Sequence, residues 1–213
     1  MTAGATSIKL STVQNFSLPY ESSETNLDSL ISAVQMGDSE PSGHRERVTI
    51  LAILLADELG VTGEDRYILE RGALLHDIGM IGVPDRVLFK KEPLSEMDWE
   101  EIKKHPRIGC RMCERVSFLV GTAKTVLSHH ERWDGSGYPV GLSGEQIPLS
   151  GRVLSAVDAL EAMYFGRPWQ PPRSIVEIRE EFLRCAETQF DPYIVNAVLS
   201  AQLDEWRNML MRR

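Results

Sequence analysis

The amino-acid sequence predicts an all-α protein. Apolar residues recur at helical spacing in nearly every segment, and Ser, Thr or Asp often stand where a helix N-cap belongs. No stretch shows sustained alternation of apolar and polar residues with a period of two, so no sheet is expected. A chain of 213 residues is long enough for one sizeable helical core.

The first helices are expected over residues 27–36 and 44–59. The segment 44–59 is apolar on a wide face and stops at Gly60, which indicates a central helix. Thr62, with Asp65 three residues later, opens the next helix. Further helices are expected after the capping pair Ser95 and Asp98, from Pro106, over 119–132 and 149–165, after the capping pair Ser174 and Glu177, and at Asp191–Pro192.

The segment 133–147, WDGSGYPVGLSGEQI, is a long stretch without helical spacing. Its glycines and proline favour turns, and a loop of this length inside a compact domain is usually functional. Residues 1–24 are rich in Ser and Thr and are expected to form a flexible arm. We therefore expect two parts, an arm over 1–24 and a single helical domain over 25–213.

The composition excludes several classes of protein. Hydrophobic residues make up 42% of the chain and charged residues 25%, which is typical of a globular protein. A net charge of −8 argues against a nucleic-acid polymer or an anionic membrane as partner, because both need a basic footprint. There is no apolar run of membrane-spanning length and no signal sequence, so no membrane association is expected.

The cysteines and the paired lysines carry little functional signal. Three cysteines are too few for a secreted disulfide framework, which favours a cytoplasmic protein. Cys110 and Cys113 have the CxxC spacing, but no second pair answers them, so a zinc or redox site is not favoured. Lys103 and Lys104 are expected to be solvated.

The five histidines carry the strongest signal. His76 and His130 fall on the apolar faces of their helices, and Asp158 lies in a segment that otherwise has the pattern of core. An aspartate there would be costly to bury without a cation or several hydrogen-bond donors. These helices therefore point a His or an Asp inward, which suggests one shared polar centre.

Each of these residues also has a simpler interpretation. A histidine on an apolar face is often a hydrogen-bonded core residue, and a buried aspartate often caps a neighbouring helix. In favour of a metal centre, the adjacent residues His76 and Asp77 project about 100° apart, which suits two metal ions. A His and Asp set without clustered Cys suits Fe, Mn or Zn in hydrolysis. The residues alone leave both interpretations open.

HDIG at 76–79 and HHERWDGSGYPVGLSGEQIP at 129–148 closely resemble the HD-GYP family, a branch of the HD metal-dependent phosphohydrolases. The similarity continues through HRERV at 44–48, IGVPDRVL at 81–88, His105, the helix of Asp158, Arg167-Pro168 and FDP at 190–192. The resemblance implies a single HD-type helical domain with a long GYP loop. It also implies a bacterial metal-dependent phosphodiesterase that hydrolyses cyclic di-GMP to linear pGpG and onward to GMP.

The resemblance further implies the site and its cofactors, two or three divalent metal ions, with Fe or Mn favoured. Asp77 would bridge two ions and, with Arg167, carry catalysis. Arg167 would bind a phosphate, and Tyr138 would line the nucleotide pocket, although a loop-anchoring role for Tyr138 stays open. The metal ligands implied are His44, His76, Asp77, His105, His129, His130 and Asp158, with Glu40 joining His44 at a third ion.

Two positions depart from the family pattern. Met80 stands where HDIGK has its lysine, and Gln170 stands where RPYK has its lysine, so two positive charges near a dianionic substrate are missing. Glu161, where aspartate is common, is a milder change. The losses are expected to weaken substrate binding or slow catalysis.

These departures keep other functions open. The main alternative is a weakly active or inactive HD-GYP domain that binds metal and a cyclic dinucleotide. Such a domain could instead dock a signalling partner, such as a diguanylate cyclase, through residues 133–147. A different cyclic dinucleotide, or an unrelated phosphoester, is a further alternative.

Overall fold

The structure is a computed structural model that describes residues 43–167 and 170–212. These residues belong to the compact unit Gly37–Arg213. The expected arm over 1–24, the expected helix over 27–36 and the candidate ligand Glu40 lie outside the described residues.

The described part of the chain is helical, as predicted, and its β-pairings are isolated bridges between Arg167 and Gln170 and between Ala186 and Phe190. The α-helices are α3 (His44–Glu58), α4 (Gly63–Leu75), α5 (Asp85–Leu88), α6 (Glu96–Ile102), α7 (His105–Glu114), α8 (Ala123–Ser128), α9 (Leu149–Phe165), α10 (Ile175–Cys185), α11 (Pro192–Ser200) and α12 (Leu203–Met211). The 3₁₀ segments are η1 (Ile78–Gly82), η2 (Ser117–Thr122) and η3 (Gly144–Gln146).

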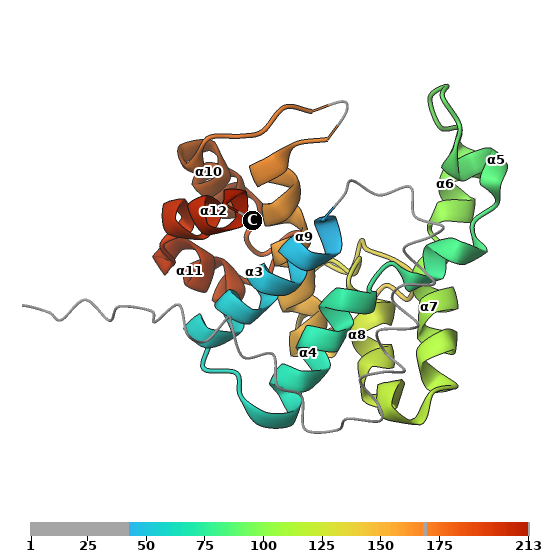
Figure 1. The fold of residues 1–213 in the computed structure, drawn as a ribbon, viewed down its shortest axis with the longest axis horizontal. Helices are drawn as coiled ribbons and strands as arrows, with labels where there is room; N and C mark the ends of the chain where they lie inside the picture. The colour runs from blue at the N-terminus through green and yellow to red at the C-terminus, as the bar shows by residue number, and fades with distance from the viewer. Residues whose placement is uncertain (1–42, 168–169, 213) are drawn as a thin grey trace, which may run out of the picture. The chain divides into compact units, whose positions relative to one another are not determined.

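Helix α3 is central, as its wide apolar face predicts. It packs against α4 and α9, and α11 packs against both α3 and α9 (Figure 1). Val48, Leu51 and Leu55 on α3 have no exposed surface. Figure 1 shows α10, α11 and α12 on one side of α3 and α9, and α5, α6 and α7 on the other. His44 begins the central helix α3, and the other histidines lie at the ends of α4, α7 and α8.

Most of the expected helix starts are present. Ser95 and Asp98 form a capping box at α6, and Ser174 and Glu177 form another at α10. Asp191 caps α11, because its carboxylate accepts the backbone N–H of Tyr193 at 2.8 Å. Thr62 occupies the N-cap of α4, but its side chain makes no capping hydrogen bond, contrary to the prediction.

The prediction of one continuous α-helix over 119–132 is wrong. The segment begins with the 3₁₀ turn η2, and α8 covers only Ala123–Ser128. Val120, Gly121 and Thr122 have low helix propensity, which explains the late start of α8. The early end frees the chain to fold back, so that the His130 carbonyl accepts the N–H of Tyr138 at 3.2 Å. The C-terminal α12, with Trp206 buried, is a further helix that the sequence reasoning did not separate.

Candidate metal centre

The described histidines and Asp77 form two groups whose ligand atoms lie within 4.8 Å of one another. The first, called here the His105 group, contains Asp77, His105, His129 and His130. The second, the His44 group, contains His44, His76 and Asp77. Asp77 is common to both groups.

The carboxylate of Asp77 divides its two oxygens between these groups. Its Oδ1 lies 2.9 Å from Nε2 of His105 and 3.6 Å from Nε2 of His129. Its Oδ2 lies 3.2 Å from Nε2 of His76. A carboxylate with one oxygen toward each set of imidazoles has the geometry of a bridge between two cations.

Hydrogen bonds from the other ring nitrogen fix the tautomers of three histidines, His76, His105 and His129. Nδ1 of His76, of His105 and of His129 donates to the backbone carbonyls of Ala73, Ile102 and Val126, at 2.7, 2.8 and 2.8 Å respectively. A carbonyl oxygen only accepts, so Nδ1 carries the hydrogen and Nε2 of a neutral ring carries a lone pair.

The Nε2 atoms are turned toward one another. Nε2 of His105 lies 3.1 Å from Nε2 of His129, and Nε2 of His44 lies 3.4 Å from Nε2 of His76. Facing lone pairs at these distances repel unless a cation lies near them. Burial lowers the pKa of His129 and lowers the pKa of His130 well below its usual range, which favours the neutral form that binds metal. The donor set therefore fits divalent cations.

His44 obtains its second hydrogen bond differently. It is the first residue of α3, and its Nδ1 donates to Oε2 of Glu161 on α9 at 2.9 Å. Its Nε2 lies 3.6 Å from Oδ1 of Asp158, one turn before Glu161. Asp158 thus lies beside the His44 group, although it is not a member of either group as defined by the 4.8 Å limit.

Residues 28–194 match the HD domain family. The chain belongs to the HD domain family. The helical architecture is confirmed as an HD fold by two solved structures, whose sequences are 22% and 20% identical to the chain. A cyclic GMP-AMP specific phosphodiesterase of V. cholerae aligns with a TM-score of 0.64, over 84% of this chain and 48% of that one. An HDG"Y"P protein from Bdellovibrio bacteriovorus aligns with a TM-score of 0.60, over 90% and 64%.

Curated HD relatives have closer sequences. A cyclic di-GMP phosphodiesterase of Thermotoga maritima is 38% identical over 167 residues, covering 78% of this chain and 45% of the relative. The cyclic di-GMP phosphodiesterase response regulator of Xanthomonas campestris pv. campestris is 36% identical over 189 residues, covering 87% and 50%. A 3'3'-cGAMP-specific phosphodiesterase of Vibrio cholerae is 32% identical, covering 88% and 37%.

The HD-GYP resemblance seen in the motifs is confirmed by these matches. The chain spans half or less of the length of these curated relatives. In the described part of the HD domain, the helices lack the combination of length and apolar character that crossing a bilayer requires.

The GYP loop of the HD domain lies against the His105 group. The ring of Tyr138 stacks on the ring of His130, with centroids 4.8 Å apart. Burial, followed by the nearby charges of Asp77 and Asp158, raises the pKa of Tyr138, so its hydroxyl keeps its proton at neutral pH. Gly137 lets the loop approach closely, because a Cβ there would lie 2.6 Å from the His130 carbonyl oxygen.

Glu131 holds this loop in place, a role that sequence reasoning missed. Its buried carboxylate accepts the backbone N–H groups of Val140 at 2.7 Å, Gly141 at 3.0 Å and Leu142 at 3.1 Å. The sequence does not reveal this role, because Glu131 becomes an acceptor only when the loop folds back and brings residues 140–142 to its carboxylate.

Arg167, the candidate phosphate ligand, contacts Glu161. Its Nη2 lies 2.9 Å from Glu161 Oε2, and Arg47 binds the other oxygen of the same carboxylate. Burial alone would raise the pKa of Glu161, but hydrogen bonding and charge from His44, with the Arg167 and Arg47 guanidinium groups, lower it to about 2. The sequence analysis identified Glu161 only as a mild departure from the family pattern, in which aspartate is common at this position. Its spacing of three from Asp158, on the buried face of α9, could have marked it as a site residue.

Met80 and Gln170, the two departures from the family pattern, have no charged group to offer a substrate. Met80 is half-buried in η1, and its backbone N–H donates to the Asp77 carbonyl at 2.9 Å. Its thioether supplies neither charge nor a donor. Gln170 turns its side-chain amide toward Arg173, whose Nη2 lies 2.9 Å from the amide oxygen in the orientation that satisfies both groups.

The side chain of Lys103 is 43% exposed, as the sequence predicted, and it pairs with Glu100 at 3.3 Å, but it also lies near the candidate site. Nζ of Lys103 lies 6.0 Å from the centroid of the Tyr138 ring, within the outer range of a cation–π contact. The side chain of Lys104 is 55% exposed and pairs with Glu101 at 2.7 Å. Lys103 thus places a positive charge at the edge of the candidate site.

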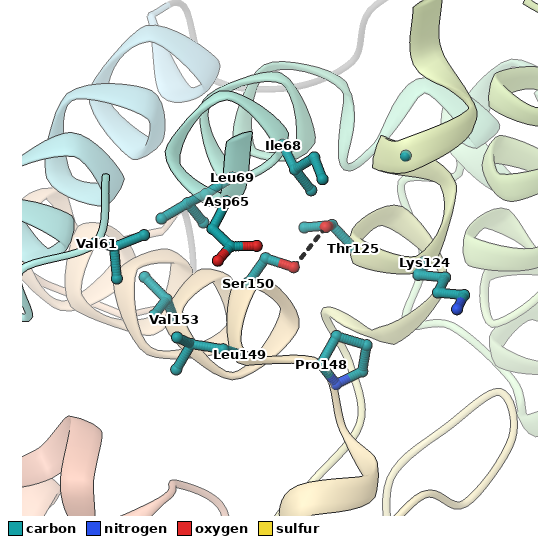
Figure 2. A pocket seen from close by; sticks show the side chains of 11 residues that line it. Val61, Asp65, Ile68, Leu69, Lys124, Thr125, Pro148, Leu149, Ser150 and Val153 are labelled. Atoms are coloured by element: carbon teal, nitrogen blue, oxygen red, sulfur yellow. Dashed lines mark hydrogen bonds between the residues drawn. The ribbon is translucent and has the colours of Figure 1, made fainter. Parts of the chain in front are cut away.

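A separate pocket of about 220 Å³ lies among residues of α4, α8 and α9 (Figure 2). The side chains of Asp65, Thr125 and Ser150 line it, and the hydroxyls of Thr125 and Ser150 are 2.7 Å apart. None of the candidate metal ligands that the structure describes lines this pocket. It is therefore distinct from the His105 and His44 groups.

Proposed function

We propose that this chain is a metal-dependent phosphodiesterase that hydrolyses cyclic di-GMP to linear pGpG and onward to GMP. The observation that carries the proposal is the shared carboxylate of Asp77, with one oxygen toward His105 and the other toward His76. The activities of the relatives supply the substrate class, since both cyclic di-GMP and cyclic GMP-AMP phosphodiesterases are among them.

The His105 group and the His44 group supply the residues that would hold the ions. His105, His129 and His130 would hold one divalent ion with Asp77, and His44, His76 and Asp158 would hold a second with the same carboxylate. Nitrogen and oxygen ligands without thiolate favour Fe or Mn over a structural zinc site. Bound ions of this kind supply Lewis-acid charge to a phosphodiester and acidify the attacking water. The alternative assignment, in which His44 leaves the second ion and holds a third one with Glu40, remains a prediction.

The chain's own residues would bind and orient the substrate. Arg167 would present its planar guanidinium to a phosphate, where two parallel hydrogen bonds fix the phosphate's orientation. Tyr138 would offer a protonated hydroxyl and an aromatic face to the nucleotide. Glu131 would keep the loop that carries Tyr138 over the site and limit the entry of bulk water.

The test is turnover of cyclic di-GMP by protein loaded with Mn or Fe, next to an Asp77→Ala control. We expect pGpG, followed by GMP, from the wild type and no product from the control. A parallel assay with 3'3'-cGAMP compares the two substrate classes. No product above the control, from protein that contains bound metal, would overturn the proposal.

A second candidate function is favoured by Met80 and Gln170. With no charge at position 80 and the Gln170 amide turned to Arg173, the domain would bind metal and cyclic dinucleotide with little turnover. It would then act by binding, or by docking a signalling protein such as a diguanylate cyclase through residues 133–147. Tight binding of cyclic di-GMP without product would support this function over the first.

We also propose a cytoplasmic protein with an arm over residues 1–24 and a domain over 25–213. Described cysteines that are free and buried support a reducing compartment. Limited proteolysis tests the boundary, since cleavage confined to residues 1–24 is expected. Cleavage that starts elsewhere would contradict it.

A further inference from the structure

The Glu161 carboxylate joins the metal centre to the candidate phosphate ligand. It has no exposed surface. Arg47 holds Oε1 through Nε at 2.8 Å and Nη2 at 2.6 Å. The other oxygen, Oε2, is shared by Nδ1 of His44 and Nη2 of Arg167, each at 2.9 Å. One anchored oxygen therefore fixes the carboxylate, and the second serves two partners.

His44 depends on this oxygen in a way that His76, His105 and His129 do not. Those three rings donate to backbone carbonyls three residues earlier. His44 begins α3, and the structure gives its Nδ1 the Glu161 carboxylate instead of a carbonyl. An acceptor behind a ligating imidazole fixes its orientation and makes its other nitrogen a stronger ligand.

We propose that Glu161 is a positioning residue whose Oε2 couples metal binding by the His44 group to phosphate binding by Arg167. The inference rests on the proposed function in taking Arg167 as the phosphate ligand. When Arg167 turns to a phosphate, Oε2 loses one of the two partners that the described residues give it and keeps His44. His44 then becomes the stronger ligand, while Arg47 keeps Glu161 in place.

The coupling has a defined sign. Phosphate binding strengthens cation binding in the His44 group, and a cation there strengthens phosphate binding by the same factor. Loss of the carboxylate and loss of Arg167 have opposite effects on the cation. Glu161→Gln weakens binding because the amide is a poorer acceptor. Arg167→Ala strengthens binding because a competing donor and a positive charge are removed.

The test is titration of the full chain with Mn²⁺ alone, with free Mn²⁺ measured by electron paramagnetic resonance. The wild type is expected to show two classes of site. Glu161→Gln is expected to weaken one class by about 10–100-fold, and Arg167→Ala to tighten the same class by about fivefold. The other class, belonging to the His105 group, should stay unchanged and so reports that the variants are folded.

A matched control and a nucleotide probe complete the experiment. Arg184→Ala removes an exposed guanidinium that pairs with Glu181, and it should leave both classes unchanged. GMP at saturating concentration should tighten the same class in the wild type and leave it unaltered in Arg167→Ala. If Glu161→Gln lacks cooperative unfolding, Glu161→Asp replaces it. The shorter carboxylate should weaken the same class selectively.

Several outcomes would overturn the proposal. These are a single class of sites in the wild type, equal weakening of both classes by Glu161→Gln, and weakening instead of tightening by Arg167→Ala. None of these measurements uses turnover, so a protein without phosphodiesterase activity can still show the coupling. Failure of the coupling and failure of the proposed function are therefore distinguishable.

Discussion

The α-carbon of Gly79 faces the backbone carbonyl of His105 so closely that a Cβ on Gly79 would overlap that oxygen. The same Cβ would lie 2.6 Å from the backbone nitrogen of Gly109. The glycine of the HDIG motif thus lets η1 pack directly on α7. This packing sets Asp77, two residues before Gly79, against His105.

Gly79→Ala is expected to destabilise the fold and separate Asp77 from His105. Because the clashing atoms are backbone, relief requires movement of η1 or α7, and overpacking of this kind costs about 1–3 kcal/mol. Thermal unfolding should show a Tm lower by several degrees, and Mn²⁺ binding by the His105 group should weaken. Gly121→Ala is the control, since its Cβ would meet only the side chain of Ile68, at 3.3 Å. Equal effects of the two variants would contradict this explanation.

Glu131→Gln is expected to loosen the GYP loop. The amide has one neutral acceptor oxygen for the N–H groups of Val140, Gly141 and Leu142, so these partly exposed donors lose hydrogen bonds to a charged group, worth about 1–3 kcal/mol. Hydrogen exchange should become faster at residues 140–142, and the KM for cyclic di-GMP should rise more than kcat falls. Glu145→Gln, at an exposed position of the same loop, should change neither quantity. Unchanged hydrogen exchange at residues 140–142 would show that the Glu131 carboxylate does not hold the loop in place.

Lys103→Gln is expected to raise the KM for cyclic di-GMP by about fivefold, which corresponds to about 1 kcal/mol. Nζ of Lys103 stands beside Tyr138 and would attract a substrate phosphate, in part replacing the charges absent at Met80 and Gln170. Steady-state kinetics at low and high salt measure the effect, which should shrink as salt rises. Lys104→Gln is the neighbouring control. Similar KM values for the two variants would place Lys103 outside the site.

Met80→Lys is expected to raise kcat/KM for cyclic di-GMP by about tenfold. A charged donor three residues after Asp77 would restore the interaction with substrate that methionine lacks, and charge-assisted hydrogen bonds are worth about 1.5–3 kcal/mol. Met97→Lys adds the same charge at a side chain that is 81% exposed, and should have no effect. If both variants behave as the wild type does, the missing lysine is not what limits turnover.

The cysteines are expected to be unreactive in the folded protein. Burial raises the pKa of Cys113 to about 12, and burial also raises the pKa values of Cys110 and Cys185. At pH 8 the thiolate fraction of each therefore falls below that of a free cysteine. Ellman's reagent should label less than about one thiol per chain before denaturation, and all three after it. Rapid labelling of the native protein would contradict this expectation and favour a redox function for Cys110 and Cys113.

The sequence predicted those parts of the fold that local patterns determine. Helix α9 has the predicted bounds, 149–165, because a strong apolar period and a glycine at its C-terminal end define it. The segment 119–132 misled the prediction, because apolar spacing does not distinguish a 3₁₀ turn from an α-helix. The interpretation of 133–147 as a long loop agrees with the structure, apart from the short turn η3.

The candidate site was predictable in composition but not in its supporting contacts. Five histidines and Asp77 in recognisable motifs indicated the centre, and the structure brings them into two groups that share Asp77. The roles of Glu131 and Glu161 depend on partners far away in the chain. Glu161 and His44 are 117 residues apart, so no local pattern could show that one carboxylate serves His44, Arg47 and Arg167.

The hydrogen bonds that fix the histidine tautomers have a second effect. Ala73 and Val126 lie in the last turns of α4 and α8, where backbone carbonyls have no partner within the helix. His76 and His129 therefore act as C-terminal caps for the helices that precede them. Replacing either histidine with alanine would fray a helix end as well as remove a ligand. Loss of activity in such a variant would not by itself identify the histidine as a metal ligand.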